Sequence, residues 1–208
     1  MIKKLYIFTI LTFISLSSFS YMELNFGVGN KSVDLRGIKP HGGNIFISYQ
    51  GYTDNNALYG VSYSQFEFDV SAEDQGNIVT ADYEFETLTV MGGYAFSDPT
   101  EGAFFIKGKY VDVDISVSVN GISVGGFADQ TGFVVSGGYF KQSNDGLNWS
   151  VELQTDISGN DIECLSYDCT AVIGDVDFQI PDSNWNFGLE VKIAEDRQTL
   201  NIGPSVKF

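Results

Sequence analysis

The chain offers little of the chemistry on which enzymes usually depend. It contains one histidine, His41, within the polar stretch IKPHGG. Histidine is the side chain used most often in general acid–base catalysis, and a nucleophile must lie within hydrogen-bond reach of such a base. No nucleophile motif accompanies His41, and the spacing of the carboxylates singles out no catalytic pair. We therefore expect no enzyme activity, no cofactor and no metal site.

Two cysteines, Cys164 and Cys169, lie close together in the polar segment NDIECLSYDC. In an oxidising compartment they would form a disulfide, and closing so small a loop would contribute about 2 kcal/mol. Free thiols are the alternative. A zinc site needs more ligands than two cysteines, and this segment lacks the regular spacing of a calcium loop. We expect the disulfide to hold one loop in place.

The charge balance is strongly acidic, with 27 Asp and Glu against 11 Lys and Arg and a formal net charge of −16. A phosphate backbone requires a basic surface, so nucleic acid is excluded as a partner. Many carboxylates fall in links between apolar segments, which predicts an acidic exposed rim. Such a rim suggests bridging divalent cations or a basic ligand, or simply a solvated surface that resists aggregation.

The first twenty residues have the pattern of a secretory signal peptide. Lys3 and Lys4 are followed by an apolar run from Leu5 to Leu16 and then by small residues at Ser18 and Ser20. We expect cleavage after Ser20, which leaves residues 21–208 as one domain. A retained N-terminal membrane anchor is the alternative, but the apolar run is short for a transmembrane helix.

The rest of the chain alternates apolar and polar residues with a period of two, which is typical of β-strands with one apolar face. In the stretch 185–193, for example, Trp185, Phe187 and Leu189 alternate with Asn186 and Gly188. Ten strands are predicted, near 22–29, 44–52, 58–69, 82–96, 103–118, 132–140, 148–157, 171–180, 185–193 and 199–208. The 171–180 strand has the weakest pattern, so eight strands are the main alternative, because closed barrels of this kind have an even strand number.

The connections alternate in length. Short turns at 53–57, 97–102, 141–147 and 181–184 consist of residues that favour tight reversals. Between them lie longer polar links at 30–43, 71–77, 120–131 and 158–170. This difference is expected when the two ends of the strands face different compartments.

The alternation fits either a soluble sandwich or a transmembrane barrel with an apolar exterior. Aromatic residues such as Tyr52, Tyr59 and Trp149 flank the short turns, as in the aromatic girdles of membrane barrels. The polar face also carries charges of both signs in mid-strand, which would line and partly fill the lumen of a barrel. These predicted lumen charges are Glu23, Lys107, Lys109, Glu152, Glu190 and Lys192.

The final stretch LNIGPSVKF places apolar residues at Leu200, Ile202, Val206 and Phe208. It is similar to the C-terminal signal by which the assembly machinery recognises bacterial outer-membrane barrels, although Pro204 departs from it because proline cannot donate to the strand ladder. With YEFETLTVMGGYAFSD, GFVVSGGYF and WNFGLEVKIAEDRQTLNIGPSVKF, the chain resembles the small OmpA-like or porin-like outer-membrane β-barrel group. The resemblance implies the outer membrane of a Gram-negative bacterium, with its lipid and lipopolysaccharide and the barrel-assembly machinery as partners.

One predicted strand breaks the pattern. In 82–96, the carboxylates Asp82, Glu84 and Glu86 share a parity with the apolar Leu88 and Val90. Charged groups cannot face lipid near mid-membrane without a cost of several kcal/mol each. Either a bulge shifts the phase near Glu86, or the acidic part projects above the outer leaflet. The apolar parity also changes beyond Tyr110, so we expect the fourth and fifth strands to extend past the membrane as a hairpin.

The function predicted for such a barrel is a non-enzymatic structural or surface-binding role with an unknown extracellular ligand. A narrow porin-like channel for small solutes is the alternative, because ten strands could enclose a thin water path. A soluble secreted β-sandwich is the third hypothesis.

Overall fold

The computed structural model describes residues 19–33, 40–74, 77–98, 100–142, 146–158, 170–194 and 197–208. They form ten strands: β1 (Phe19–Val33), β2 (His41–Thr53), β3 (Ala57–Asp74), β4 (Asn77–Ala95), β5 (Ala103–Val119), β6 (Ile122–Gln142), β7 (Leu147–Asp156), β8 (Thr170–Gln179), β9 (Trp185–Ala194) and β10 (Arg197–Lys207). None of these residues belongs to a helix that is long and apolar enough to cross a bilayer.

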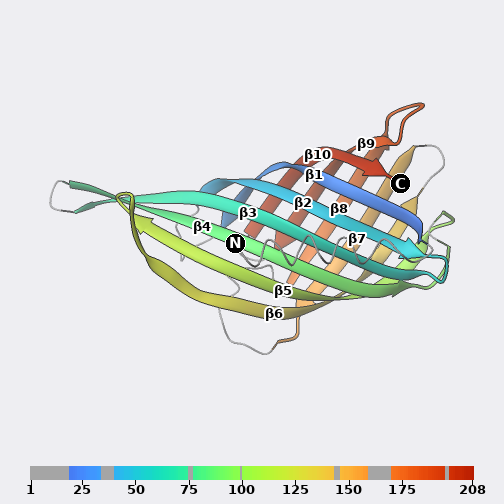
Figure 1. Ribbon diagram of the computed structural model, residues 1–208, viewed down its shortest axis with the longest axis horizontal. Helices are drawn as coiled ribbons and strands as arrows, with labels where there is room; N and C mark the ends of the chain where they lie inside the picture. Colours follow the sequence, from blue (N-terminus) through green and yellow to red (C-terminus); the bar gives the residue numbers. More distant parts are fainter. Residues whose placement is uncertain are drawn as a thin grey trace.

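The ten strands close into one antiparallel up-and-down barrel (Figure 1). Each strand pairs with its neighbours in sequence, and β10 pairs with β1 to complete the ring, with Glu23 opposite Lys207 and Val28 opposite Ile202. The ladder continues to the end of the chain, because the Phe208 N–H donates to the carbonyl of Met22 at 2.9 Å. The prediction of a closed ten-stranded barrel is confirmed, and the weakly patterned stretch near 171–180 is the strand β8.

The barrel is apolar outside and polar inside. Side chains at alternate positions point to opposite faces of a strand, so each strand contributes to both surfaces. Exposed apolar residues around the outside include Phe26, Val28, Ile45, Ile47, Ile106, Val151, Leu153, Val172, Val191 and Ile202. Buried polar residues inside include Glu23, Asn44, Ser136, Glu152, Gln154, Asn186, Asn201 and Ser205. A soluble sandwich would bury the first set and expose the second, so the sandwich hypothesis is wrong for this fold.

One end of the barrel carries the four tight turns between β2 and β3, β4 and β5, β6 and β7, and β8 and β9, together with the C-terminus (Figure 1). Each of these four turns contains a residue with positive φ: Asn56 at 60°, Gly102 at 99°, Gly146 at 85° and Asp182 at 58°. Asparagine, aspartate and glycine tolerate this conformation best, which explains why these turn sequences reverse the chain so sharply. We call this the short-turn end.

At the opposite end, four strands extend beyond the others. β3, β4, β5 and β6 contain 18, 19, 17 and 21 residues and form a projecting sheet, which tapers at the left of Figure 1. The links predicted at 71–77 and 120–131 are therefore mostly strand, and the expected two-stranded hairpin is a four-stranded sheet. Asn120 and Gly121, with φ of 51° and 77°, form a two-residue turn between the paired residues Val119 and Ile122. Asn-Gly is the preferred sequence for such a hairpin turn because both residues must adopt positive φ.

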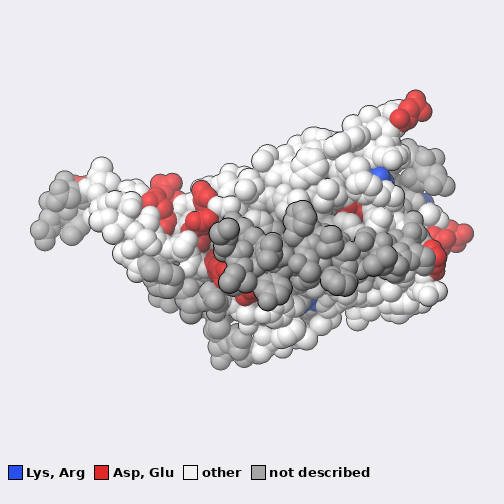
Figure 2. Space-filling view, viewed as in Figure 1, with Lys and Arg blue, Asp and Glu red and all other residues white. Residues whose placement is uncertain are grey.

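The acidic stretch of β4 has no bulge. Its register with β3 runs without a shift from Tyr94 to Asn77, and its register with β5 is equally continuous. The bulge proposed to explain the carboxylates on the apolar parity of this strand is therefore wrong. Glu84 and Glu86 lie on the same outer face of β4 as Leu88 further along. On the face shown in Figure 2, acidic side chains gather on the projecting sheet and at the short-turn end.

The inner face of β5 also keeps its phase. Val111 and Val113 lie on the same face as Lys107 and Lys109. The strand therefore does not change phase beyond Tyr110. Instead, its inner face changes from polar to apolar. Register shifts occur only further along, in the pairing of β5 with β6 between Val113 and Ser118.

Candidate functional site

The interior contains two adjoining spaces that make the lumen the candidate functional site. A chamber of about 300 Å³ lies between the barrel walls, and a smaller pocket of about 110 Å³ lies toward the short-turn end. Some residues line both spaces and form the boundary between them. The shared residues are Gln50, Met91, Lys107, Ser150, Asp175 and Asp177.

One wall of the lumen carries a compact group of charges from β5 and β7. Glu152 accepts from Lys107 at 2.7 Å and also pairs with Lys109, and all three side chains are at most 16% exposed. Lys109 donates in addition to Gln154 at 2.9 Å. Three buried charges held by hydrogen bonds fix the geometry of this wall, because loss of Glu152 would leave both ammonium groups without compensation.

A second wall, formed by β8, β9, β10 and β1, is acidic. Glu23 accepts from Ser205 at 2.7 Å and from Asn186 at 3.2 Å, so neutral donors satisfy it. On β9, Glu190 accepts from Asn201 at 2.8 Å. Asp175 and Asp177 on β8 complete the wall. The lumen therefore has carboxylates along one side and a lysine-rich group along another.

The six predicted lumen charges all lie on the inner face. The structure brings Lys107, Lys109 and Glu152 together, whereas Glu23 and Glu190 bind neutral donors and Lys192 lines the chamber. Sequence reasoning missed Asp175 and Asp177, which were in the weakest predicted strand. Their alternation with Val172, Val176 and Phe178 was the signal that could have placed them inside.

The other predicted site residues have different positions. Cys164 and Cys169 lie outside the described residues, as do residues 1–18 of the predicted signal peptide. Of the predicted C-terminal signal, Leu200, Ile202 and Phe208 are exposed on β10 and at its end. Pro204 is accommodated within β10, opposite Phe187 of β9. His41 is the exposed first residue of β2.

Toward the projecting sheet, the inner face becomes apolar. The buried residues Phe66, Phe68, Phe85, Val111, Val113 and Val134 pack together, and we call them the apolar cluster. The rings of Phe66 and Phe85 are 6.0 Å apart, and Lys31 of β1 lies over Phe66 at 5.2 Å from the ring centre. Val111 and Val134 also line the chamber, so the cluster begins where the chamber ends.

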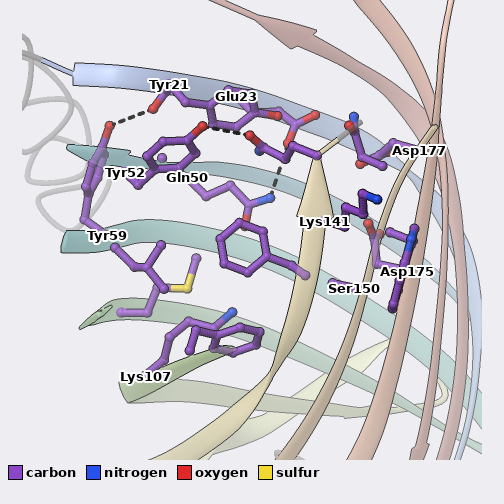
Figure 3. A pocket seen from close by; sticks show the side chains of 18 residues that line it. Tyr21, Glu23, Gln50, Tyr52, Tyr59, Lys107, Lys141, Ser150, Asp175 and Asp177 are labelled. Carbon is purple, nitrogen blue, oxygen red and sulfur yellow. Dashed lines mark hydrogen bonds between the residues drawn. The ribbon is translucent and has the colours of Figure 1, made fainter. Parts of the chain in front are cut away.

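Tyrosines surround the pocket near the short-turn end (Figure 3). The rings of Tyr21 and Tyr52 stack with their centres 5.2 Å apart. Tyr52 donates to Gln142 at 2.8 Å, and Tyr59 donates to the carbonyl of Tyr21 at 3.3 Å. These bonds join β1, β2, β3 and β6 across the pocket and hold its shape.

The closed ladder, the apolar exterior and the polar interior define a transmembrane β-barrel. No known protein-family model matches the sequence, and no curated protein is similar to it in sequence. Among solved structures, the translocator domain of the autotransporter NalP from Neisseria meningitidis has a TM-score of 0.53 at 11% identity, over 100% of this chain and 95% of that domain. The fold is thus that of a bacterial outer-membrane barrel.

Two further solved structures show a weaker likeness. The outer-membrane protein OprG from Pseudomonas aeruginosa has a TM-score of 0.46 at 12% identity, over 92% of this chain and 97% of OprG. The attachment invasion locus protein Ail of Yersinia pestis has a TM-score of 0.40 at 14% identity, over 92% of this chain and 100% of Ail.

Proposed function

We propose that this chain is an integral protein of the outer membrane of a Gram-negative bacterium, with a non-enzymatic structural or surface-binding role. Residues 1–20 act as the signal peptide, and Cys164 and Cys169 form a disulfide in the oxidising periplasm or at the cell surface. The partners are outer-membrane lipid and lipopolysaccharide, the barrel-assembly machinery during insertion, and an extracellular ligand at the projecting sheet.

The observation that carries the proposal is the apolar cluster at the end of the chamber. A solute that crossed the lumen would have to pass side chains such as Phe66, Phe85 and Val113, each at most 8% exposed. Apolar constrictions exclude water and ions by dewetting. This supports a barrel that is closed at its outer end over one that conducts steadily.

The projecting sheet supports the surface-binding role. Its outer face carries carboxylates on three adjacent strands, with Glu67 opposite Glu84 and Glu86 opposite Asp114. Gln65 donates to Glu67 at 2.7 Å and to Glu84 at 2.6 Å, which partly offsets the repulsion between these two groups. A negative surface beyond the membrane would attract basic ligands and repel anionic ones.

The narrow channel is the second candidate, because the chamber and the pocket adjoin. Single-channel recording in planar bilayers separates the two functions. We expect no steady openings from the native barrel and conductance from a variant with Phe66→Ala and Phe85→Ala. Steady openings of the native protein would favour the channel and contradict the closed barrel.

The location and assembly have their own tests. We expect the protein in the detergent-extracted outer-membrane fraction, with different gel mobility before and after boiling. Release by osmotic shock without detergent would contradict the proposal. Deleting Phe208 should lower the amount of inserted barrel while leaving the unfolding midpoint of the inserted fraction nearly unchanged, whereas the exposed-turn change Glu101→Gln should affect neither.

A further inference from the structure

We propose that the pocket at the short-turn end is a binding site for a small molecule that carries both a protonated amine and an oxygen acceptor, such as a short amino alcohol or amino acid. The inference goes beyond the structural and surface-binding role, because it concerns the lumen and not the projecting sheet. It rests on the carboxylates, the rings and one unsatisfied amide that line this pocket.

The first step is the excess of negative charge. Glu23, Asp175 and Asp177 all line the pocket, and in the described part of the chain none of them lies within ion-pair distance of a lysine or arginine. Glu23 and Asp177 are only 3% and 8% exposed. Buried carboxylates are normally paired with a cation or bind protons. Neutral donors already hold Glu23, so a cationic group in the pocket would serve as the partner of Asp175 and Asp177.

Two lysines, Lys107 and Lys141, line the pocket, and neither forms an ion pair with these carboxylates in the described part of the chain. Lys107 lines the pocket but is bound to Glu152 at 2.7 Å, and its ammonium lies over the Phe105 ring at 4.4 Å from the centre. It is therefore held on the far wall, where it adds a positive site across from the carboxylates. A ligand with opposite charges or dipoles at its two ends matches this arrangement.

The aromatic walls also suit a cation. Tyr21, Tyr52 and Tyr59 line the pocket, and ring faces attract ammonium groups within about 6 Å. The ammonium of Lys207 already lies 5.6 Å from the centre of the Tyr21 ring. Figure 3 shows Tyr21, Glu23, Gln50 and Tyr52 along one side of the pocket and Asp175 and Asp177 along another.

An unsatisfied donor points independently to a ligand. Asn148 lines the same pocket, is only 7% exposed, and its Nδ2 has no hydrogen-bond partner. It lies opposite Asp177 in the β7–β8 ladder. A buried donor without a partner costs about 1–3 kcal/mol, so an acceptor in the pocket would be favourable. A bare metal ion offers no acceptor, and the described residues hold no group of three or more side chains arranged for a metal.

Size and access narrow the choice. The pocket has about 110 Å³, which suits a molecule of a few non-hydrogen atoms. Its rim lies beside the tight turns, at Tyr52 and Gln142, while the apolar cluster borders the far end of the chamber. The ligand would therefore enter from the short-turn end.

Binding is tested with the full barrel refolded in detergent, with ethanolamine as the probe and isothermal titration calorimetry as the readout. Methylamine lacks the acceptor, and ethylene glycol lacks the amine. We expect saturable binding of ethanolamine, at least tenfold weaker binding of methylamine, and none of ethylene glycol. Equal binding of all three, or no saturation by 100 mM ethanolamine, would overturn the proposal.

Two variants assign the contacts. Asp177→Asn should weaken ethanolamine binding at least tenfold, and Asn148→Ala should weaken ethanolamine about fivefold without affecting methylamine. The exposed-turn change Glu101→Gln is the matched control and should alter neither. If Asp177→Asn does not give the heat-modifiable folded form, Asp175→Asn provides the same test. Unchanged binding in the folded variants would overturn the site, whereas the outer-membrane role would be unaffected because fractionation measures it separately.

Discussion

Replacing Glu152 by glutamine should destabilise the barrel by about 3–5 kcal/mol, the typical cost of breaking a buried ion pair. The carboxylate accepts from both Lys107 and Lys109, so the substitution removes the counterion of two ammonium groups at once. Groups that contact the same carboxylate lie about 5 Å apart, and at an effective dielectric constant of 20 they repel by about 3 kcal/mol. With a total stability of about 5–15 kcal/mol, most of the margin could be lost.

The assay is equilibrium unfolding in urea from lipid vesicles, followed by the fluorescence of Trp149 and Trp185, the two tryptophans of the chain. Lys109→Gln alone should cost less, because the bond between Lys107 and Glu152 remains. Combined with Glu152→Gln, it should recover about 1–3 kcal/mol, since the repelling pair is gone.

Glu101→Gln in an exposed turn should change the unfolding free energy by less than about 0.5 kcal/mol and serves as the control. A cost below about 1 kcal/mol for Glu152→Gln would refute the reasoning. It would mean that water in the chamber solvates the two lysines as well as the carboxylate does.

Three further substitutions test other parts of the structure. Leu153→Arg, on the exposed apolar belt, should cost about 2–4 kcal/mol in the same urea assay if this surface faces lipid, and nearly nothing if it faces water. Phe85→Ala in the apolar cluster should cost about 3–5 kcal/mol by leaving a cavity, measured as a lower unfolding midpoint. In the turn before β5, hydrogen bonds from the Thr100 N–H and hydroxyl lower the pKa of Asp98. The stabilisation from the Asp98 carboxylate is complete above the pKa of this group in the unfolded chain, and it is lost as the pH falls through the lower pKa of the folded chain. Thr100→Ala should therefore raise the pKa of Asp98, as measured by NMR titration.

The regular alternation made most of the barrel predictable from sequence. Trp185, Phe187 and Leu189 face outward from β9 because a two-residue period leaves no other arrangement once one face meets lipid. The same rule placed Glu152 and Lys107 on the inner face. It could not show that they touch, since that depends on the register between β5, β6 and β7, which local patterns do not fix.

The strand ends were harder to predict, because polarity alone does not distinguish a loop from a strand in water. Beyond the membrane a strand needs only main-chain pairing, so Asp69 and Asp82 lie opposite each other in a continuous ladder. Asn120 and Gly121 did carry a hairpin signal, but the polar residues around them were interpreted as a link. The apolar cluster was not predicted, because two of its members, Val111 and Val113, lie on the same face of β5 as Lys107 and Lys109.

The pairing of β1 with β10 has a consequence for how the molecule is made. The first strand of the barrel has its final partner in the last one, with Val33 matched to Arg197 and Glu23 to Lys207. Until these two strands pair, each presents unpaired amides and carbonyls that can bind other chains. A factor that covers both strand edges and dissociates only when they pair would protect the unfinished barrel from aggregation.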